Sequence, residues 1–331
     1  MIPMKDKIVP FTCSGKWARC LQGHVKVAKV TSYSMKYIEG MPIKIVRQHY
    51  IETFDKFGNH LKTLEFDQNG TLIGEEICNY SDEGLLLEVT FSKKGKITLH
   101  DIHEYNNGHV VRISSYGEEN TFRGDTIFIY DKKDNLIEHR WDSRTPENRW
   151  KWVYTYDENG NRLTGSYYTG SQNRFSHQVC NTYDENGAKV NYYTKNADDT
   201  IELPKVSEKD KNGNIIHIPA SRYRLESESR YNDSNDIIEK KIYDFYKERY
   251  VKNTIKYFYS FDHQLERVIT LDRYGNIEEV RELSYDANHN LIKVIAYEGE
   301  QNKISYISEH EYIYYSYREL TGENLDKLFD D

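Results

Sequence analysis

Cysteine, proline and long apolar segments are all scarce in this 331-residue sequence. The four cysteines are too few for a disulfide framework, and no CxxC pair is present for zinc or redox chemistry. The nearest two, Cys13 and Cys20, are either bridged or left as buried thiols. No apolar stretch approaches the roughly 20 residues that span a bilayer, so we expect no membrane span.

The first twenty residues also lack the apolar region of a signal peptide. We expect a cytoplasmic location if Met1 is the natural start. If a leader was removed, we expect the cell envelope or secretion instead.

Positive charge is not in excess either. A net charge of −8 and a pI near 5.9 argue against a general binder of phosphate backbones, which would carry a basic patch. Aromatic residues, in contrast, make up 14% of the chain and include 29 Tyr. Tyr favours strands, and disordered chains are poor in aromatic residues. The composition therefore predicts a folded, β-rich protein with no nucleic-acid partner.

A short turn signature recurs along the chain: an aromatic residue, then Asp or Asn, a few variable residues, then Gly and often Asn. Examples are Phe54–Asn59, Tyr156–Asn161 and Tyr285–Asn290. The side chain of Asp or Asn accepts hydrogen bonds from its own turn, and Gly supplies the positive φ that a tight hairpin needs. With looser polar turns between the copies, a turn arrives about every 12 or 13 residues, which is typical of short strands.

This spacing predicts an all-β fold, a continuous antiparallel meander of hairpins. Because sheets beyond about ten strands curl or split, we expect a superhelical or shell-like sheet. Residues 1–50 are expected to form N-terminal capping strands (Val25–Val30 and Ile43–Tyr50), and residues 51–317 the repeat array. Residues 318–331 are expected to form an acidic tail or short helix, with one folding unit overall.

Trp and Arg are concentrated between residues 140 and 154. If the 143–148 loop closes a hairpin, Trp141 lies opposite Trp150 and His139 opposite Trp152, all on one face. Such residues form binding hot spots, but cross-strand Trp pairs also fill sheet cores, and both interpretations stay open. The candidate binding residues are Trp141, Trp150, Trp152, Arg140, Arg144, Arg149 and Tyr154.

The segment Tyr156–Leu163 (YDENGNRL) resembles the YD repeat of bacterial Rhs-type proteins, and the copies at Tyr183 and Tyr285 are similar. The resemblance covers about residues 51–292. Hairpins at 54–95 resemble MORN-type, antitoxin-like repeats more weakly. Rhs proteins wrap such repeats into a shell that encloses a toxin. This chain is too short for that role and has no Asp-Pro dipeptide of the Rhs self-cleavage motif, so the resemblance implies only the β-meander.

No local motif indicates catalysis. His100, Asp101, His103 and Glu104 form the densest group of ligand-type residues, but they alternate across a predicted strand and cannot surround one ion. We expect a solvated strand there. GxSxG, P-loop and GxGxxG motifs are absent. We therefore expect no enzyme activity, no cofactor and no metal.

The expected function is a non-enzymatic binding or scaffold protein that presents an aromatic-rich sheet surface to a protein or a glycan. Two alternatives remain. One is an immunity or antitoxin-like protein that binds and neutralises a toxin, and the other is a glycan-active enzyme.

Overall fold

The computed structural model describes residues 21, 23–184, 187, 189–202, 208–219, 225–244, 250–299 and 303–316. Cys13, Cys20 and the predicted tail at 318–331 lie outside these residues. Over the described residues the chain forms 23 strands assigned to one sheet, and the two 3-10 segments, η2 and η3, have three residues each. The predicted all-β class is confirmed.

The chain divides into two compact units, which share several strands. The first unit comprises the described parts of residues 1–31, 46–124 and 310–331, and the second those of 32–45 and 125–309. The division passes through strands rather than linkers. The predicted boundaries at residues 50 and 317 stay predictions.

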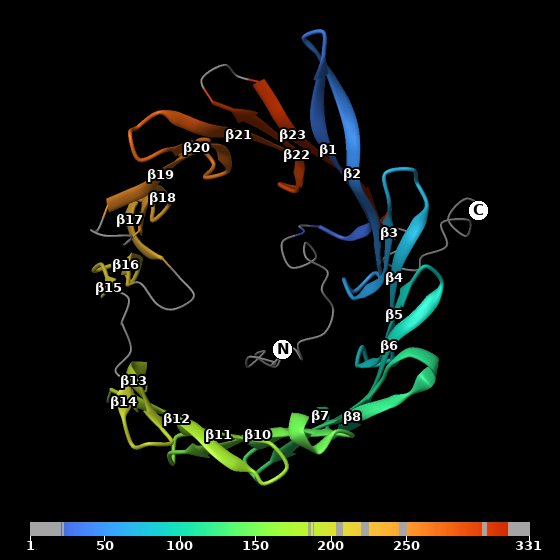
Figure 1. Ribbon diagram of the computed structural model, residues 1–331, viewed down its shortest axis with the longest axis vertical. Helices are drawn as coiled ribbons and strands as arrows, with labels where there is room; N and C mark the ends of the chain where they lie inside the picture. The colour runs from blue at the N-terminus through green and yellow to red at the C-terminus, as the bar shows by residue number, and fades with distance from the viewer. Residues whose placement is uncertain are drawn as a thin grey trace, which may run out of the picture. The chain divides into compact units, whose positions relative to one another are not determined.

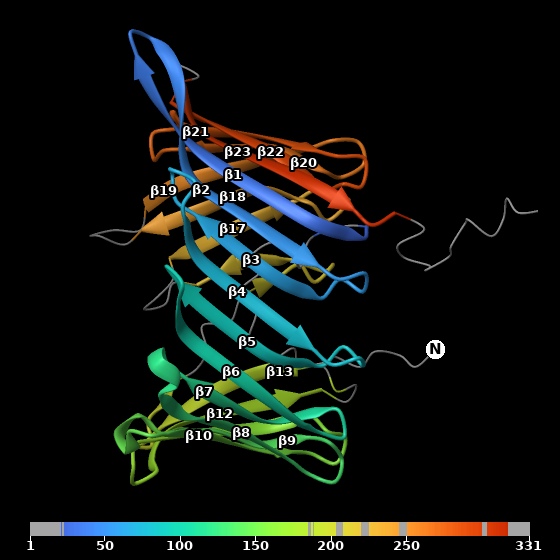
Figure 2. The same ribbon diagram turned by 90° about the vertical axis from the view of Figure 1, so that its right-hand side faces the viewer.

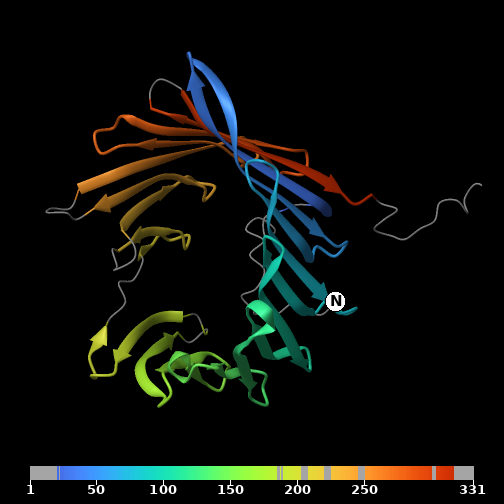
Figure 3. The same ribbon diagram turned by 45° about the vertical axis from the view of Figure 1, so that its right-hand side comes forward.

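The elements that begin before residue 122 are seven strands and one 3-10 segment. They are β1 (Val25–Ile38), β2 (Met41–Phe54), β3 (His60–Phe66), β4 (Leu72–Tyr80), β5 (Leu86–Lys93), β6 (Lys96–Asn106), β7 (His109–Tyr116) and η2 (Glu118–Asn120). The predicted strands Val25–Val30 and Ile43–Tyr50 lie within β1 and β2, which are longer and form a hairpin, blue in Figure 3. Strands β2 to β6 lie side by side in Figure 2.

The remaining elements follow in chain order. They are β8 (Phe122–Tyr130), β9 (Leu136–Ser143), η3 (Pro146–Asn148), β10 (Trp150–Tyr156), β11 (Arg162–Thr169), β12 (Arg174–Tyr183), β13 (Lys189–Asn196), β14 (Ile201–Glu202), β15 (Glu208–Lys209), β16 (Ile215–Ile218), β17 (Glu226–Tyr231), β18 (Ile237–Asp244), β19 (Tyr250–Tyr259), β20 (Leu265–Leu271), β21 (Ile277–Tyr285), β22 (Leu291–Glu298) and β23 (Lys303–Tyr314). Successive strands pair antiparallel from β9 to β14 and from β15 to β23, as a meander requires (Figure 1).

The turn after β10 shows how the signature reverses the chain. Oδ1 of Asp157 accepts hydrogen bonds from the backbone N–H of Asn159 at 3.0 Å and of Asn161 at 2.8 Å. The side-chain amide of Asn161 donates to the other carboxylate oxygen at 2.9 Å. Gly160 lies at φ +85, in the left-handed region. The predicted positive φ at Gly160 is confirmed. The Asp, Gly and Asn of the signature each have a physical role in the turn.

The same turn recurs with small variations. Asn or Ser can replace the Asp, and a few polar residues adopt the positive φ in place of Gly. Turns with the Asp carboxylate bonded to two backbone amides are at Asp55, Asp67, Asp131, Asp210, Asp272 and Asp286. Asn232 accepts the equivalent pair, and Asn235 takes the Gly position at φ 66.

Tyrosines tie neighbouring repeats together. The hydroxyl of Tyr156, the residue before the turn, donates at 2.7 Å to the carbonyl of Leu136, the residue after the preceding turn on that edge. Tyr259 bonds to Ile237 at 2.9 Å and Tyr285 to Leu265 at 2.8 Å in the same way. The abundance of Tyr therefore supplies hydroxyl donors as well as strand-forming rings.

The first unit buries polar as well as apolar side chains. Val25, Ala28 and Phe54 form a small hydrophobic cluster. Along β6, burial alternates as predicted, but Asp101 and His103 are only 7% and 4% exposed. The expectation of a solvated strand is therefore wrong for these two residues, because their face of the sheet is the buried one.

Replacing Gly160 with Val should lower the melting temperature more than replacing the exposed Glu158 with Val. A β-branched residue at positive φ is strained by about 1–3 kcal/mol. Gly160→Asn should cost less, because Asn235 adopts this conformation at the same turn position. Thermal melts of the three variants check this. Equal melting temperatures for the two Val variants would contradict the turn assignment.

The turn carboxylates should make the fold sensitive to acid. Hydrogen bonds from Asn135, Asn161 and Asn214 hold the pKa values of Asp131, Asp157 and Asp210 below their usual range. A lowered folded-state pKa stabilises the fold above the unfolded pKa of about 3.9, and this contribution is lost as the pH falls through the folded value.

Replacing all three of Asp131, Asp157 and Asp210 by Asn should reduce the loss of folding stability at low pH. Asn232 accepts the same backbone hydrogen bonds without a charge. Denaturant unfolding below about pH 4 measures it, that being near the unfolded pKa. An acid dependence as steep as that of the unmodified protein would show that these carboxylates are not its source.

Candidate functional site

The hairpin of β9 and β10 brings the candidate tryptophans together. Trp141 pairs with Trp150 and His139 with Trp152, so the predicted register is confirmed. On the next strands, Tyr167 lies opposite Trp152, and His177 lies opposite Tyr167. Since paired residues of an antiparallel sheet share a face, rings from four strands meet on one side.

These rings contact one another in series and are named here the aromatic ladder. Phe128 stacks on His139 at 5.1 Å between ring centroids, and His139 meets the edge of Trp150 at 4.7 Å. Trp150 and Trp152 both contact the Tyr167 ring. The members of the ladder are Phe128, His139, Trp150, Trp152, Tyr154, Tyr167 and His177.

Gly165 on β11 makes room for the largest rings. It pairs with Tyr154, and a Cβ added there would lie 3.2 Å from Tyr154 Cδ1 and 3.4 Å from Trp152 Cε3. The rings of Trp152 and Tyr154 are nearly parallel, with an interplanar angle of 3°. The missing side chain at Gly165 lets both rings lie close to the backbone of β11.

Every ring of the ladder is half-buried, not enclosed as in a core. Burial lowers the pKa of His139, which favours the uncharged form of its imidazole. Burial also raises the pKa of Tyr154, an effect opposed by Arg162, whose guanidinium lies 5.2 Å above the Tyr154 ring. The ladder is thus an apolar, largely uncharged surface with a cation at one end.

The candidate arginines do not share the ladder's face. Arg140 pairs with Lys151 on the other side of the sheet and forms ion pairs with Glu138 at 2.5 Å and Asp142 at 3.0 Å. Arg149 donates to the Ser143 carbonyl at 3.0 Å, and Arg144 is exposed in the same connection. Trp150, Trp152 and Tyr154 therefore belong to the ladder, and Trp141 lies on the same face opposite Trp150. The three arginines lie outside the ladder.

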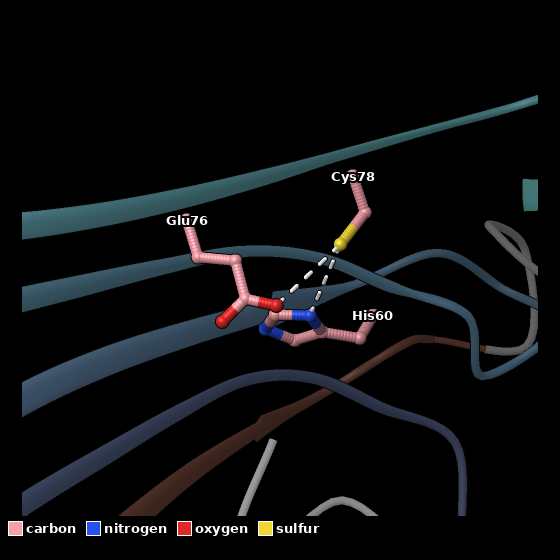
Figure 4. A group of neighbouring side chains, drawn as sticks. All are labelled: His60, Glu76 and Cys78. Atoms are coloured by element: carbon pink, nitrogen blue, oxygen red, sulfur yellow. Dashed lines mark hydrogen bonds between the residues drawn. The ribbon is translucent and has the colours of Figure 1, made fainter. Parts of the chain in front are cut away.

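A second cluster lies in the first unit and was missed by reasoning from the sequence. His60, Glu76 and Cys78 offer ligand atoms within 4.8 Å of one another, and all three residues are buried (Figure 4). Glu76 and Cys78 show the period of two that places both on one face of β4. His60 comes from β3, so no local motif marks the group.

Among the described residues, no helix has the length and apolar character needed to cross a membrane.

No family model matches this chain, and no curated protein matches it. Among solved structures, TcdB2-TccC3 is similar at 12% identity with a TM-score of 0.36, over 82% of this chain and 19% of that one. A porin-like protein from Bacteroides uniformis is similar at 8% identity with a TM-score of 0.27, over 88% and 99% of the two chains. One from Bacteroides vulgatus has 12% identity and a TM-score of 0.22, over 87% and 99%.

The chain thus spans 19% of the length of TcdB2-TccC3, the first of these structures. At such identities and TM-scores, no function follows from these likenesses.

Proposed function

We propose that this chain is a non-enzymatic binding or scaffold protein of the YD-repeat type, which presents the aromatic ladder to a protein or glycan partner. The observation that carries the proposal is the half-buried state of seven contacting rings on one face of the second unit. Rings that served only as core would be enclosed, because burying aromatic surface is what stabilises a core.

The chemistry of the ladder suits recognition by contact. Trp and Tyr provide large rigid surfaces at little conformational cost and dominate interface hot spots. His139 adds a polar edge, whose uncharged form is favoured because burial lowers the pKa of the imidazole, and Arg162 adds a positive charge beside Tyr154. The apolar ring surface of the ladder, with polar groups at its margin, suits either the apolar face of a sugar ring or an aliphatic and aromatic protein surface.

The scaffold supports this role because the ring positions are fixed by backbone pairing. Trp152 is held between His139 on β9 and Tyr167 on β11, because the backbone of β10 pairs with both of these strands. Side chains fixed in this way lose little freedom on binding, so more of the contact energy appears as affinity.

Truncating Trp152 to Ala should weaken partner binding by about thirtyfold or more, since a buried anchor typically contributes at least 2 kcal/mol. Trp150→Ala tests a second ring of the ladder, and Trp141→Ala tests the neighbour that pairs with Trp150 on the same face. Binding is measured on an oligosaccharide array and, for any ligand found, by titration of tryptophan fluorescence. A panel of purified candidate protein partners, toxins included, follows the same titration.

Tyr168→Ala is the matched control. Tyr168 lies on the same strand as Tyr167 but on the opposite face, against Phe175 and Lys151. It should leave binding unchanged. If the Trp variants bind as well as the unmodified protein, or lower stability by the about 3–5 kcal/mol expected of a pure core, the ladder is structural and the proposal is wrong.

A further inference from the structure

A group of ionisable side chains is buried on one face of strands β2, β3 and β4 in the first unit. His60 is 5% exposed, Glu76 6% and Cys78 3%. Cys78 is not part of a disulfide bond among the described residues. Burying a carboxylate, an imidazole and a thiol together is costly unless their charges are matched, so this composition calls for a physical reason.

The Cys78 sulfur lies at distances from His60 and Glu76 that are close to those of a tetrahedral metal site. Zinc binds sulfur at about 2.3 Å and nitrogen or oxygen at about 2.0–2.2 Å, which places tetrahedral ligand atoms about 3.3–3.7 Å apart. Sγ of Cys78 lies 3.7 Å from Nδ1 of His60 and 3.9 Å from Oε1 of Glu76. Figure 4 shows the three side chains pointing toward one another from β3 and β4. Both of these distances are at or within a few tenths of an ångström of the tetrahedral spacing.

The orientation of His60 is set by a second partner. Its Nε2 lies 2.8 Å from the hydroxyl of Thr63, which leaves Nδ1 facing Cys78. Histidines that bind metals almost always bond through their other nitrogen to an oxygen, which fixes the ring and its tautomer. The ring of Phe54 packs against His60 at 5.7 Å between centroids and provides an apolar wall.

Glu52 adds an independent observation. It is 5% exposed, and its Oε2 makes no hydrogen bond within the part of the chain that the structure describes. It lies opposite Thr63, which in turn lies opposite Glu76, so the two carboxylates flank Thr63 in one row across three strands. Burial raises the pKa of Glu52, and the nearby His60 opposes that shift. Glu52 lies outside the group of three whose ligand atoms are within 4.8 Å of one another, so its side chain would have to rotate toward them to act as a fourth ligand.

A cavity of about 220 Å³ lies against the two carboxylates, although His60 and Cys78 do not line it. Glu52, Thr63 and Glu76 are among the residues that line it, together with Gln48 and Tyr50. An ion could therefore reach the row of carboxylates without unfolding the sheet.

We propose that His60, Glu76 and Cys78 bind a divalent zinc ion, with Glu52 as the fourth ligand. The mixed nitrogen, oxygen and sulfur donors suit zinc, a borderline-soft ion that accepts all three. On binding, the Cys78 thiol loses its proton to solvent and coordinates as the thiolate, while His60 coordinates as the neutral imidazole. The ion fastens β2, β3 and β4 together, a structural role that is separate from partner binding at the ladder.

The full chain, expressed with zinc in the medium, should contain about one zinc ion per molecule by elemental mass spectrometry, as a closed four-ligand site predicts. Chelation should lower the melting temperature, and added zinc should restore it, because a ligand that binds only the folded state stabilises it. Cobalt added to the zinc-free protein should give a near-ultraviolet thiolate-to-cobalt absorption band.

Cys78→Ser should abolish that band, and Cys180→Ser is its matched control. Cys180 is also buried and bonds at 3.5 Å to a side-chain oxygen two residues earlier, but that oxygen belongs to the amide of Gln178. If Cys78→Ser fails to fold, Thr63→Val keeps every ligand and should lower zinc affinity about 10–100-fold through the freed His60 ring. Glu52→Gln should also weaken binding.

Zinc-free protein that neither takes up cobalt nor gains stability from zinc would overturn the proposal. So would a cobalt band that survives Cys78→Ser, since the metal would then be bound elsewhere. Neither result bears on the ladder, whose test uses different residues and a different readout.

Discussion

The hydrogen bonds that a turn carboxylate accepts from the backbone of its own turn determine where the strands of this fold end and where the chain reverses. In the turn at Asp157, one oxygen accepts two amides and the other accepts the Asn161 side chain, while Gly160 takes the positive φ that closes the loop. Five residues thus satisfy their own polar groups and reverse the chain. Wherever this unit recurs, the strands before and after it have fixed ends and a fixed direction.

Residues at each turn also form hydrogen bonds with the neighbouring repeat. These bonds help to explain the stability of a chain that has few fully buried large side chains. Tyr156 bonds to the carbonyl beside the preceding turn, and His263 bonds at 2.8 Å to Asp236 in the turn before its own. Only Val89 and Asn290 have fully buried side chains among the larger described residues. Stability therefore depends on many contacts between adjacent repeats, as in other repeat proteins, and less on a single core.

The turns, the strand class and the Trp141–Trp150 register could be predicted because each depends on residues close in sequence. The buried cluster could not. His60 pairs with Phe54 next to a register shift, and no sequence pattern locates such a bulge. Period-two alternation separates the two faces of a strand but does not say which face is buried, which is why Asp101 and His103 were expected in solvent. The unit boundary likewise runs inside strands, where composition does not change.

Because the turns specify the fold, the strand faces are free to carry side chains that do not improve folding. The half-buried rings of the ladder forgo some of the roughly 25 cal/mol that each square ångström of apolar burial contributes. Glu52 and Glu76 have the opposite cost: polar groups are buried instead of apolar surface being exposed, and the carboxylates lose their hydration. A partner surface would relieve the first cost and a cation the second. Residues that a fold tolerates at a cost, and that one kind of ligand would stabilise, are where function is best sought.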